Sequence, residues 1–256
     1  MTTGDSAARF FLLTYILTIP FLILGSVVKQ PLLPGLPVTA LMFVCPTLAA
    51  LAMISREAGT TGAKAFLQRS FDYKRIQAKR WYLPTLLLCP AMSVMSFIVL
   101  RMTGTAVPKP HETVGSIVGL SVAFFVAAAG EELGWTGYAL EPLEERLGAL
   151  GSGLLIGAVW AVWHFVALIQ IHRSADWIGW WSLYSVALRV IMVWLYLHAG
   201  RSVFAVSLLH ALSNVCWQIF PVHGSFFEPR VTGMIAAGVA VALFLGERIV
   251  TARNSP

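Results

Sequence analysis

Six ionisable side chains fall inside stretches that are otherwise apolar: Glu131, Glu132, His164, Arg189, His198 and His210. A charged group in the hydrocarbon core of a bilayer is costly, so each of them is a candidate for function. A carboxylate and an imidazole can act as general bases on a water molecule, and imidazole or amide donors can stabilise an oxyanion. His198 is set aside because it ends its apolar stretch beside Gly200 and Arg201. His111, His172 and His223 are set aside as loop residues.

The composition places these residues in a membrane. Of the 256 residues, 57% are hydrophobic and 12% are charged, whereas a soluble domain is about 45–50% apolar and about 25% charged. A spanning helix needs about 20 mostly apolar residues. Such stretches occur near residues 10–28, 35–54, 81–100, 114–139, 153–170, 179–198, 202–220 and 231–247. We therefore predict an all-α fold, a polytopic membrane helical bundle with about eight transmembrane helices, as a single transmembrane domain over residues 1–256.

The charges of the loops predict the orientation, because Lys and Arg concentrate in cytoplasmic loops. With eight spans, the N-terminus, the loops near 55–80, 140–152 and 199–201 and the C-terminal tail share one side. That side carries twelve of the 18 Lys and Arg residues, and the other side carries five. We expect both termini in the cytoplasm and a multi-pass integral protein of the bacterial cell (inner) membrane. The net charge of +6 belongs to these loops, so we expect no nucleic-acid partner.

The cytoplasmic basic loop 55–80 is the one substantial polar insertion. Phe66, Phe71, Tyr73 and Ile76 alternate with its basic residues, which suits a helix lying on an anionic membrane surface. A solvated loop whose charge only determines topology is the second interpretation.

Depth along the predicted spans brings the candidates together. At 1.5 Å per residue, Glu131 lies roughly 12–14 Å, His210 roughly 12 Å and His164 roughly 16 Å from the cytoplasmic ends of their spans. We therefore expect one cavity, open to the cytoplasmic side, with the two imidazoles within about 12 Å of each other. Glu131 and Glu132 point about 100° apart on a helix, so only one of them can face it.

Residues four apart share a helix face. His210 and Asn214 are four apart in one span, and Trp160 and His164 are four apart in another. Both pairs can therefore reach the same cavity.

Three short motifs in these spans resemble the CPBP family, the intramembrane proteases related to the CAAX prenyl endopeptidase Rce1 and to bacteriocin-processing and immunity (Abi-type) proteins. The family pattern is Glu-Glu-x-x-x-Arg, then an aromatic and a His with three residues between them, then His-x-x-x-Asn. This chain has Glu131-Glu132-Leu133-Gly134-Trp135-Thr136, Trp160-Ala161-Val162-Trp163-His164 and His210-Ala211-Leu212-Ser213-Asn214. The resemblance covers about residues 115–220.

The resemblance implies an intramembrane endopeptidase. Glu131 and His164 would activate water, His210 and Asn214 would stabilise the oxyanion, and no cofactor would be needed. The substrate would be a membrane-associated protein or peptide, lipidated or not. The family arginine is Thr136 here, which leaves Glu132 without its expected partner. Arg189, near the centre of its span, is the candidate to replace it; alternatively, Arg189 snorkels to a headgroup.

Three other functions remain open. Glu131, His164 and His210 form an acceptable zinc set with an open position, although the spacing is not His-Glu-x-x-His. An inactive relative acting as an immunity or regulatory membrane protein would tolerate Thr136. A transporter would use buried Glu and His as a proton relay, but no inverted repeat is visible in the sequence.

Overall fold

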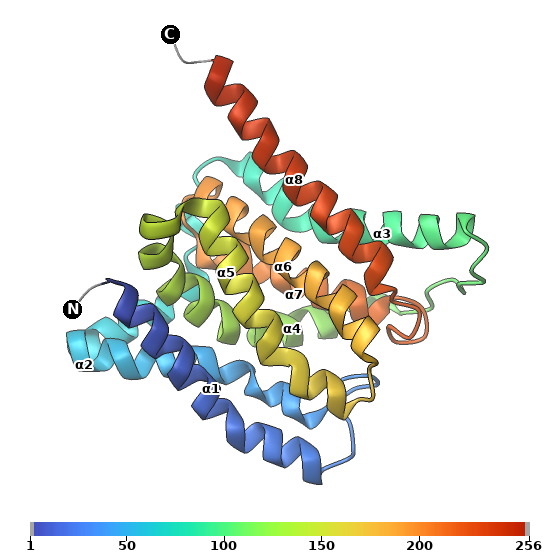
Figure 1. Cartoon of the computed structure of the whole chain (residues 1–256), viewed down its shortest axis with the longest axis horizontal. Coiled ribbons are helices and arrows are strands. Elements are labelled where there is room, and N and C mark those ends of the chain that lie inside the picture. The colour runs from blue at the N-terminus through green and yellow to red at the C-terminus, as the bar shows by residue number, and fades with distance from the viewer. Residues whose placement is uncertain (1–2, 254–256) are drawn as a thin grey trace.

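The computed structural model describes the backbone of residues 3–253 and the side chains of residues 6–246, and within that part the chain is helical without strands. Eight α-helices follow one another (Figure 1): α1 (Thr3–Val27), α2 (Cys45–Gln68), α3 (Tyr82–Met102), α4 (Val114–Gly134), α5 (Leu140–Gln170), α6 (Ala175–His198), α7 (Val203–Ile219) and α8 (Pro229–Arg253). A π-helical turn, η5 (Trp135–Ala139), joins α4 to α5.

Six helical stretches of the described chain are long and apolar enough to cross a membrane. One of them, Val114–Gln170, holds both α4 and α5, and the shorter apolar helix Val203–Ile219 is α7. Gly148 lets the chain reverse within this long stretch, because its φ of 68° is one that glycine adopts without strain. The prediction of an all-α, polytopic membrane bundle with about eight spans is therefore confirmed.

Two predicted loops are largely helical. In the predicted loop 140–152, residues 140–147 form the first part of α5, and the chain reverses at Gly148. Residues 55–68 continue α2, which reverses at Gly59, where φ is 63°. Hydropathy separates apolar from polar stretches but does not show whether a polar stretch is helical. It therefore predicts loops for these two polar segments.

The rest of the basic segment folds onto the bundle as three 3₁₀ turns, η2 (Arg69–Phe71), η3 (Tyr73–Arg75) and η4 (Lys79–Trp81). Phe66 and Ile76 are buried, while Phe71 and Tyr73 are exposed. Asp72 accepts hydrogen bonds from the backbone N–H groups of Val203 (3.3 Å) and Phe204 (3.0 Å) at the start of α7. The segment is thus neither an amphipathic surface helix nor a solvated loop, because Phe66, Ile76 and Asp72 pack against the protein.

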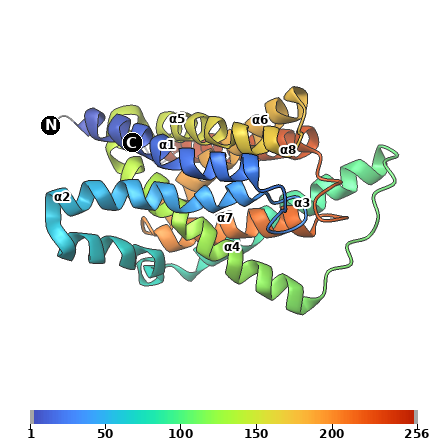
Figure 2. The same cartoon turned by 90° about the horizontal axis from the view of Figure 1, so that it is seen from below.

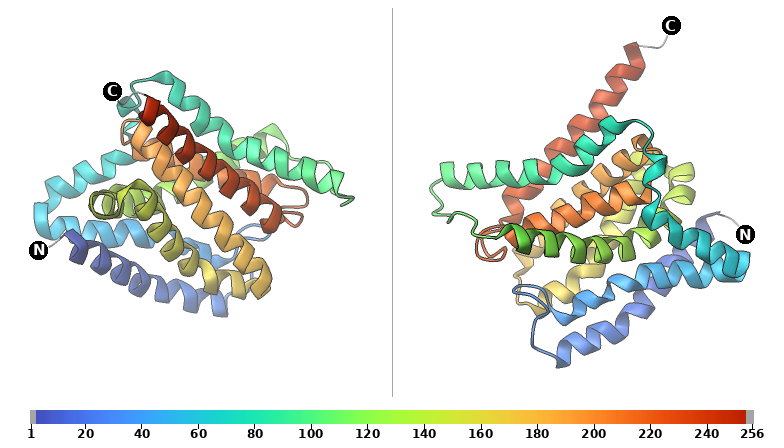
Figure 3. Two further views of the ribbon diagram at one scale, coloured as in Figure 1. Left: turned by 45° about the horizontal axis from the view of Figure 1, so that its top comes forward. Right: turned by 180° about the vertical axis from the view of Figure 1, so that it is seen from behind.

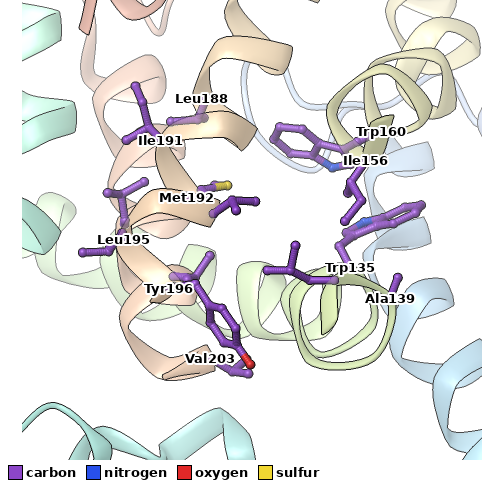
Figure 4. Packing of buried hydrophobic residues seen from close by; sticks show 14 of the residues in the cluster. Trp135, Ala139, Ile156, Trp160, Leu188, Ile191, Met192, Leu195, Tyr196 and Val203 are labelled. Atoms are coloured by element: carbon purple, nitrogen blue, oxygen red, sulfur yellow. The ribbon is translucent and has the colours of Figure 1, made fainter. Parts of the chain in front are cut away.

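The helices pack around α6 and α7. The packed pairs include α5 with α6, α6 with α8, α4 with α7, α2 with α4 and α3 with α7. Two views from other sides show α8 lying along α6 and α1 beside α5 (Figure 3). In the core, Trp160 faces the α6 side chains Leu188 and Ile191 (Figure 4), whereas Trp135 packs against Phe10 and Trp163.

Small residues let the helices that carry the candidate residues approach closely. A Cβ on Gly134 of α4 would lie 2.5 Å from the Pro46 backbone of α2. A Cβ on Gly157 of α5 would lie 2.9 Å from the Cα of Val186 and 3.1 Å from the Cβ of Arg189 on α6. Such contacts are typical of helix packing in membranes, and they place α2, α5 and α6 tightly about Glu132.

The connections gather at two ends of the bundle (Figure 2). The start of α1 and the reversals at Gly59 and Gly148 lie at one end, and the segments 28–37, 103–113, 171–174 and 220–228 lie at the other. This is the grouping of loops that the orientation argument assumed. The assignment of one end to the cytoplasm stays a prediction; residues 1–2 and 254–256 and the side chains of Arg248 and Arg253 lie outside the described part.

Candidate active site

The two adjacent glutamates of α4 point in different directions. Glu131, which is 7% exposed, lines a cavity in the middle of the bundle. Glu132 is fully buried and faces α6 and α7. This division follows from the 100° between neighbouring helical residues.

Glu132 is the centre of a buried ionic network. Arg189 of α6 donates to both of its carboxylate oxygens, from Nη1 at 2.5 Å and from Nη2 at 2.9 Å. The hydroxyl of Thr136 donates to Oε2 at 2.5 Å, and Nδ1 of His210 lies 2.9 Å from Oε1. A bidentate arginine–carboxylate pair is both strong and directional. Glu132 therefore ties α4, α6 and α7 together at one point.

Arg189 is fully buried, so the alternative that it snorkels to a headgroup is wrong. Its guanidinium stands over the ring of Trp160, 4.6 Å from the centroid. Its Nη1 also lies 3.3 Å from the hydroxyl of Thr136, the residue at the position of the family arginine. The structure thus places the guanidinium of Arg189 against Glu132 and Thr136 together.

Trp160 of α5 contacts four charged or titratable residues of the site, Glu131, His164, Arg189 and His210. Its indole N–H donates to Oε2 of Glu131 at 2.7 Å, and its backbone oxygen lies 2.9 Å from Nδ1 of His164. Its ring meets the imidazoles of His164 and His210 edge-on, at centroid distances of 5.3 and 5.2 Å. The two imidazoles therefore lie within the 12 Å limit that the sequence argument set.

His210 and Asn214 lie on the same face of α7, and both line the cavity. The side chain of Ser202 caps the start of this helix by accepting from the backbone N–H of Ala205 at 3.2 Å. The hydroxyl of Ser213 donates to the carbonyl of His210 at 2.7 Å, so it serves local packing.

One cavity collects Glu131, His164, His210 and Asn214. The cavity has a volume of about 130 Å³. Trp163 and Trp181 hold the ring of His164 at centroid distances of 4.8 and 5.3 Å. The sequence analysis missed these two tryptophans, because an aromatic residue in an apolar stretch gives no signal that separates a cavity wall from ordinary core.

The expected opening at the end that carries segment 55–80 is wrong. The exposed residues of the cavity wall, Gly35 and His223, and the half-buried Arg173 come from the opposite end of the bundle. Below Glu132, Arg69 donates to the carbonyl of Gly137 at 2.7 Å, and Phe66 lies under the same turn. The helical rise predicts how far each candidate residue lies from the end of its span. It does not predict that segment 55–80 closes the nearer end of the bundle.

Two other expectations concern single histidines. His198 ends α6 with Nδ1 2.8 Å from the carbonyl of Trp194, at the helix end as expected. His223, set aside as a loop residue, lines the mouth of the cavity instead. The loop 220–228 folds back over the bundle end, which hydropathy cannot show.

To hold a zinc ion, Glu131, His164 and His210 would have to converge on one point. Within the described residues, no three His, Cys, Asp or Glu side chains are grouped so that they could hold a metal ion. Glu131, His164 and His210 are therefore not grouped as a set of zinc ligands within the described part of the chain.

Comparisons with known proteins agree with the motifs. The model of the family described as type II CAAX prenyl endopeptidase Rce1-like matches residues 113–216. The CAAX prenyl protease 2 of Methanococcus maripaludis is 25% identical over 224 residues, which cover 81% of this chain and 79% of that protein. Both likenesses support a protease. The resemblance drawn from the three motifs is thereby confirmed, and this chain is a multi-pass membrane protein whose residues 113–216 match the Rce1-like CAAX prenyl endopeptidase family.

Proposed function

We propose that this protein is an intramembrane endopeptidase that hydrolyses a peptide bond in a membrane-associated protein or peptide, with water activated by Glu131 and His164. One observation carries the proposal: Glu131, His164, His210 and Asn214 come from three helices and line one cavity. The family match supports the class of reaction.

Hydrogen-bond partners support the assignment of the bases. A carbonyl can only accept, so Nδ1 of His164 carries the hydrogen that faces the Trp160 carbonyl, and Nε2 keeps its lone pair. Glu131 is oriented by the Trp160 indole N–H. Both groups can then draw a proton from one water molecule, whose oxygen attacks the carbonyl carbon of the scissile bond.

His210 and Asn214 face the negative charge that forms on the carbonyl oxygen. Glu132 accepts from Nδ1 of His210, which leaves Nε2 for the cavity. In its doubly protonated form His210 donates from Nε2, and Asn214 donates from its amide. When the intermediate collapses, the C–N bond breaks and the proton taken from water passes to the leaving amine.

Glu132 and Arg189 act as positioning residues in this proposal. Their ion pair neutralises a buried carboxylate and fixes the ring of His210. Thr136 therefore does not leave Glu132 without a cation, which removes the main reason to favour a proteolytically inactive relative.

The membrane we propose is the inner membrane of a bacterium. A helical bundle supports this choice, because outer-membrane proteins are typically β-barrels. A lipidated substrate stays one form of the proposal, since the relative in Methanococcus maripaludis is named a CAAX prenyl protease.

A trapping experiment tests the function. Glu131→Ala, purified from its native membrane, should retain uncleaved substrate that the wild type releases, and mass spectrometry would identify it. Glu145→Ala, at an exposed glutamate of α5, is the matched control. Equal recovery of every protein from both variants would count against the proposal. Stoichiometric zinc in the purified wild type, with activity lost on chelation and regained with zinc, would favour the zinc version.

A further inference from the structure

Residues 73–81, here called the basic segment, concentrate positive charge on the surface of the bundle. The segment contains no Asp or Glu, and its four basic residues are exposed: Lys74, Arg75, Lys79 and Arg80. Arg75 pairs with Asp72 at 3.7 Å. The other three basic residues have no carboxylate partner within the described part of the chain. Three cations are therefore available to a negatively charged partner.

The basic segment lies where a membrane span begins. Its last turn, η4, runs directly into α3, and the apolar span Lys79–Met102 includes both. Trp81 and Tyr82 are half-buried at this point, and such side chains are typical of the membrane–water interface. The guanidinium of Arg80 stands over the ring of Trp81, 5.4 Å from its centroid. The charges thus lie at the depth of the lipid headgroups.

The surface that continues from these charges along α3 is apolar. Leu83, Leu87 and Val94 are exposed and share one side of the helix. Phe71 and Tyr73, beside the basic residues, are exposed as well. A small soluble anion would leave these side chains uncovered, whereas a phospholipid offers a phosphate to the charges and acyl chains to the apolar surface.

The protein holds the backbone of the basic segment in place. Ile76 is buried, and a Cβ on Gly200 would collide with the backbone carbonyl of Arg75. Just before the segment, Asp72 accepts from the hydroxyl of Ser202 at 2.8 Å and from backbone N–H groups at the start of α7. The charged side chains therefore project from a fixed surface, so that binding a ligand orders little besides the side chains themselves.

We propose that Lys74, Lys79 and Arg80 bind the phosphate headgroup of an anionic phospholipid whose acyl chains lie along Leu83 and Leu87 of α3. Ammonium and guanidinium groups donate charge-assisted hydrogen bonds to phosphate oxygens. A basic residue near an anionic membrane surface strengthens attachment roughly fivefold.

A bound lipid should also stabilise the bundle. It would fix the basic segment against the start of α7, the helix that carries His210 and Asn214. The lipid site lies on the surface of the bundle and shares no residue with the central cavity. Lipid binding is therefore independent of the endopeptidase function.

Thermal unfolding in detergent micelles tests the site. The protein is titrated with dioleoyl phosphatidylglycerol, which is anionic, or with dioleoyl phosphatidylcholine, which is zwitterionic, and tryptophan fluorescence reports the melting temperature. Phosphatidylglycerol should raise the melting temperature of the wild type more than phosphatidylcholine does. About 0.5 M salt should weaken this difference by screening the charges. Glycerol 1-phosphate, a soluble source of the same phosphate chemistry, should give no shift.

Two variants with the same loss of charge separate a binding site from general attraction. The site variant carries three substitutions in the basic segment: Lys74→Gln, Lys79→Gln and Arg80→Gln. Its half-saturating concentration of phosphatidylglycerol should rise about tenfold or more. The control variant changes three exposed basic residues at the same end of the bundle: Arg56→Gln, Lys64→Gln and Arg146→Gln. It should keep the wild-type value.

The contrary outcomes are distinct. Equal shifts with the two lipids, or an equal loss of affinity in the site and control variants, would overturn the site. A full shift with glycerol 1-phosphate would make the ligand a soluble phosphate and the lipid assignment wrong. If the site variant does not fold, its three substitutions are measured singly; each should raise the half-saturating concentration about fivefold, and three unchanged values would overturn the site.

Discussion

At the residue scale, the ion pair of Glu132 and Arg189 supplies the cation that Thr136 cannot supply. A buried carboxylate without a cation is very costly, but here the cation comes from another helix rather than from the next turn of the same one. Arg189 also touches Thr136, so the two positions share one carboxylate. They should therefore be coupled energetically.

The first prediction concerns this coupling. Arg189→Ala should destabilise the protein by about 3–5 kcal/mol, because it leaves Glu132 buried and unpaired. Thr136→Arg combined with Arg189→Ala should recover much of that loss, since an arginine at position 136 stands one turn from Glu132. The measurement is a double-mutant cycle on thermal stability in detergent. Arg230→Ala, at a partly exposed pair, should cost at most about 1 kcal/mol; strictly additive effects at 136 and 189 would contradict the account.

The second prediction separates the indole donor of Trp160 from its ring. Trp160→Phe keeps an aromatic ring but removes the N–H that holds Glu131. The turnover number kcat should fall about tenfold to a hundredfold, the scale of a hydrogen bond to a charged group. Trp194→Phe is the control, because this indole packs against Trp81 and His198 and does not line the cavity. Equal kcat values for the two variants would refute a role of the indole in orienting Glu131.

The residue types and depths predicted which side chains meet, and the structure shows where that reasoning stops. Glu131, His164, His210 and Asn214 could be named because charge inside an apolar stretch is rare. The indole bond to Glu131 could not, because it depends on how α5 is rotated against α4. The place of His223 at the cavity mouth could not either, since it depends on the fold of the loop 220–228.

At the element scale, the C-terminal end of α4 packs closely against α2. The helix passes into the π-helical turn Trp135–Ala139 directly after the glutamates, a feature often found at functional sites. Gly134 lies against the Pro46 backbone, and Arg69 holds the Gly137 carbonyl. The position of Glu132 therefore depends on α2 as well as on its own helix.

The third prediction tests this packing. Gly134→Ala places a methyl group 2.5 Å from the Pro46 backbone, so α2 and α4 must separate. We expect a lower melting temperature in detergent and a loss of cleavage activity. Gly119→Ala is the control on the same helix, because a Cβ there meets nothing within 4 Å. A Gly134→Ala protein as stable and active as Gly119→Ala would show that the close approach is not required.

Hydropathy predicted the spanning helices because each must bury about 20 apolar residues in lipid. It failed for the polar segments after Gly59 and before Gly148, which are helical although they are not apolar enough to be predicted as spans. Asp72 is an example. It accepts hydrogen bonds from backbone N–H groups at the start of α7, but nothing in the sequence of segment 55–80 indicates which helix end it caps.

At the scale of the whole molecule, the basic loops and the mouth of the cavity lie at opposite ends of the bundle. The end with segment 55–80 carries the positive charge, and the cavity mouth lies at the end with segments 171–174 and 220–228. If the positive end is cytoplasmic, the substrate enters from the other face of the membrane. The sidedness of the protein therefore bears directly on the nature of its substrate.

The fourth prediction is this sidedness. A reporter fused after Pro256 should read out in the cytoplasm, because Lys and Arg retain the loops of that side. In intact cells, a membrane-impermeant maleimide should label Ser225→Cys and not Lys64→Cys, both at exposed positions. The native cysteines are buried and give a low background. Labelling of Lys64→Cys alone would reverse the orientation and put the cavity mouth in the cytoplasm.

In the proposed reaction, Glu131 activates the water that cleaves the substrate. The most direct test is the initial rate of cleavage of the trapped substrate by wild type and by Glu131→Gln, in the same nanodiscs and at equal thermal stability. Glutamine keeps the shape and an acceptor for the Trp160 indole but cannot take a proton. The rate should fall by about 10²–10⁴-fold, while Glu145→Gln should cleave at the wild-type rate. A Glu131→Gln protein that cleaves as fast as wild type would contradict the assignment of Glu131 as the base.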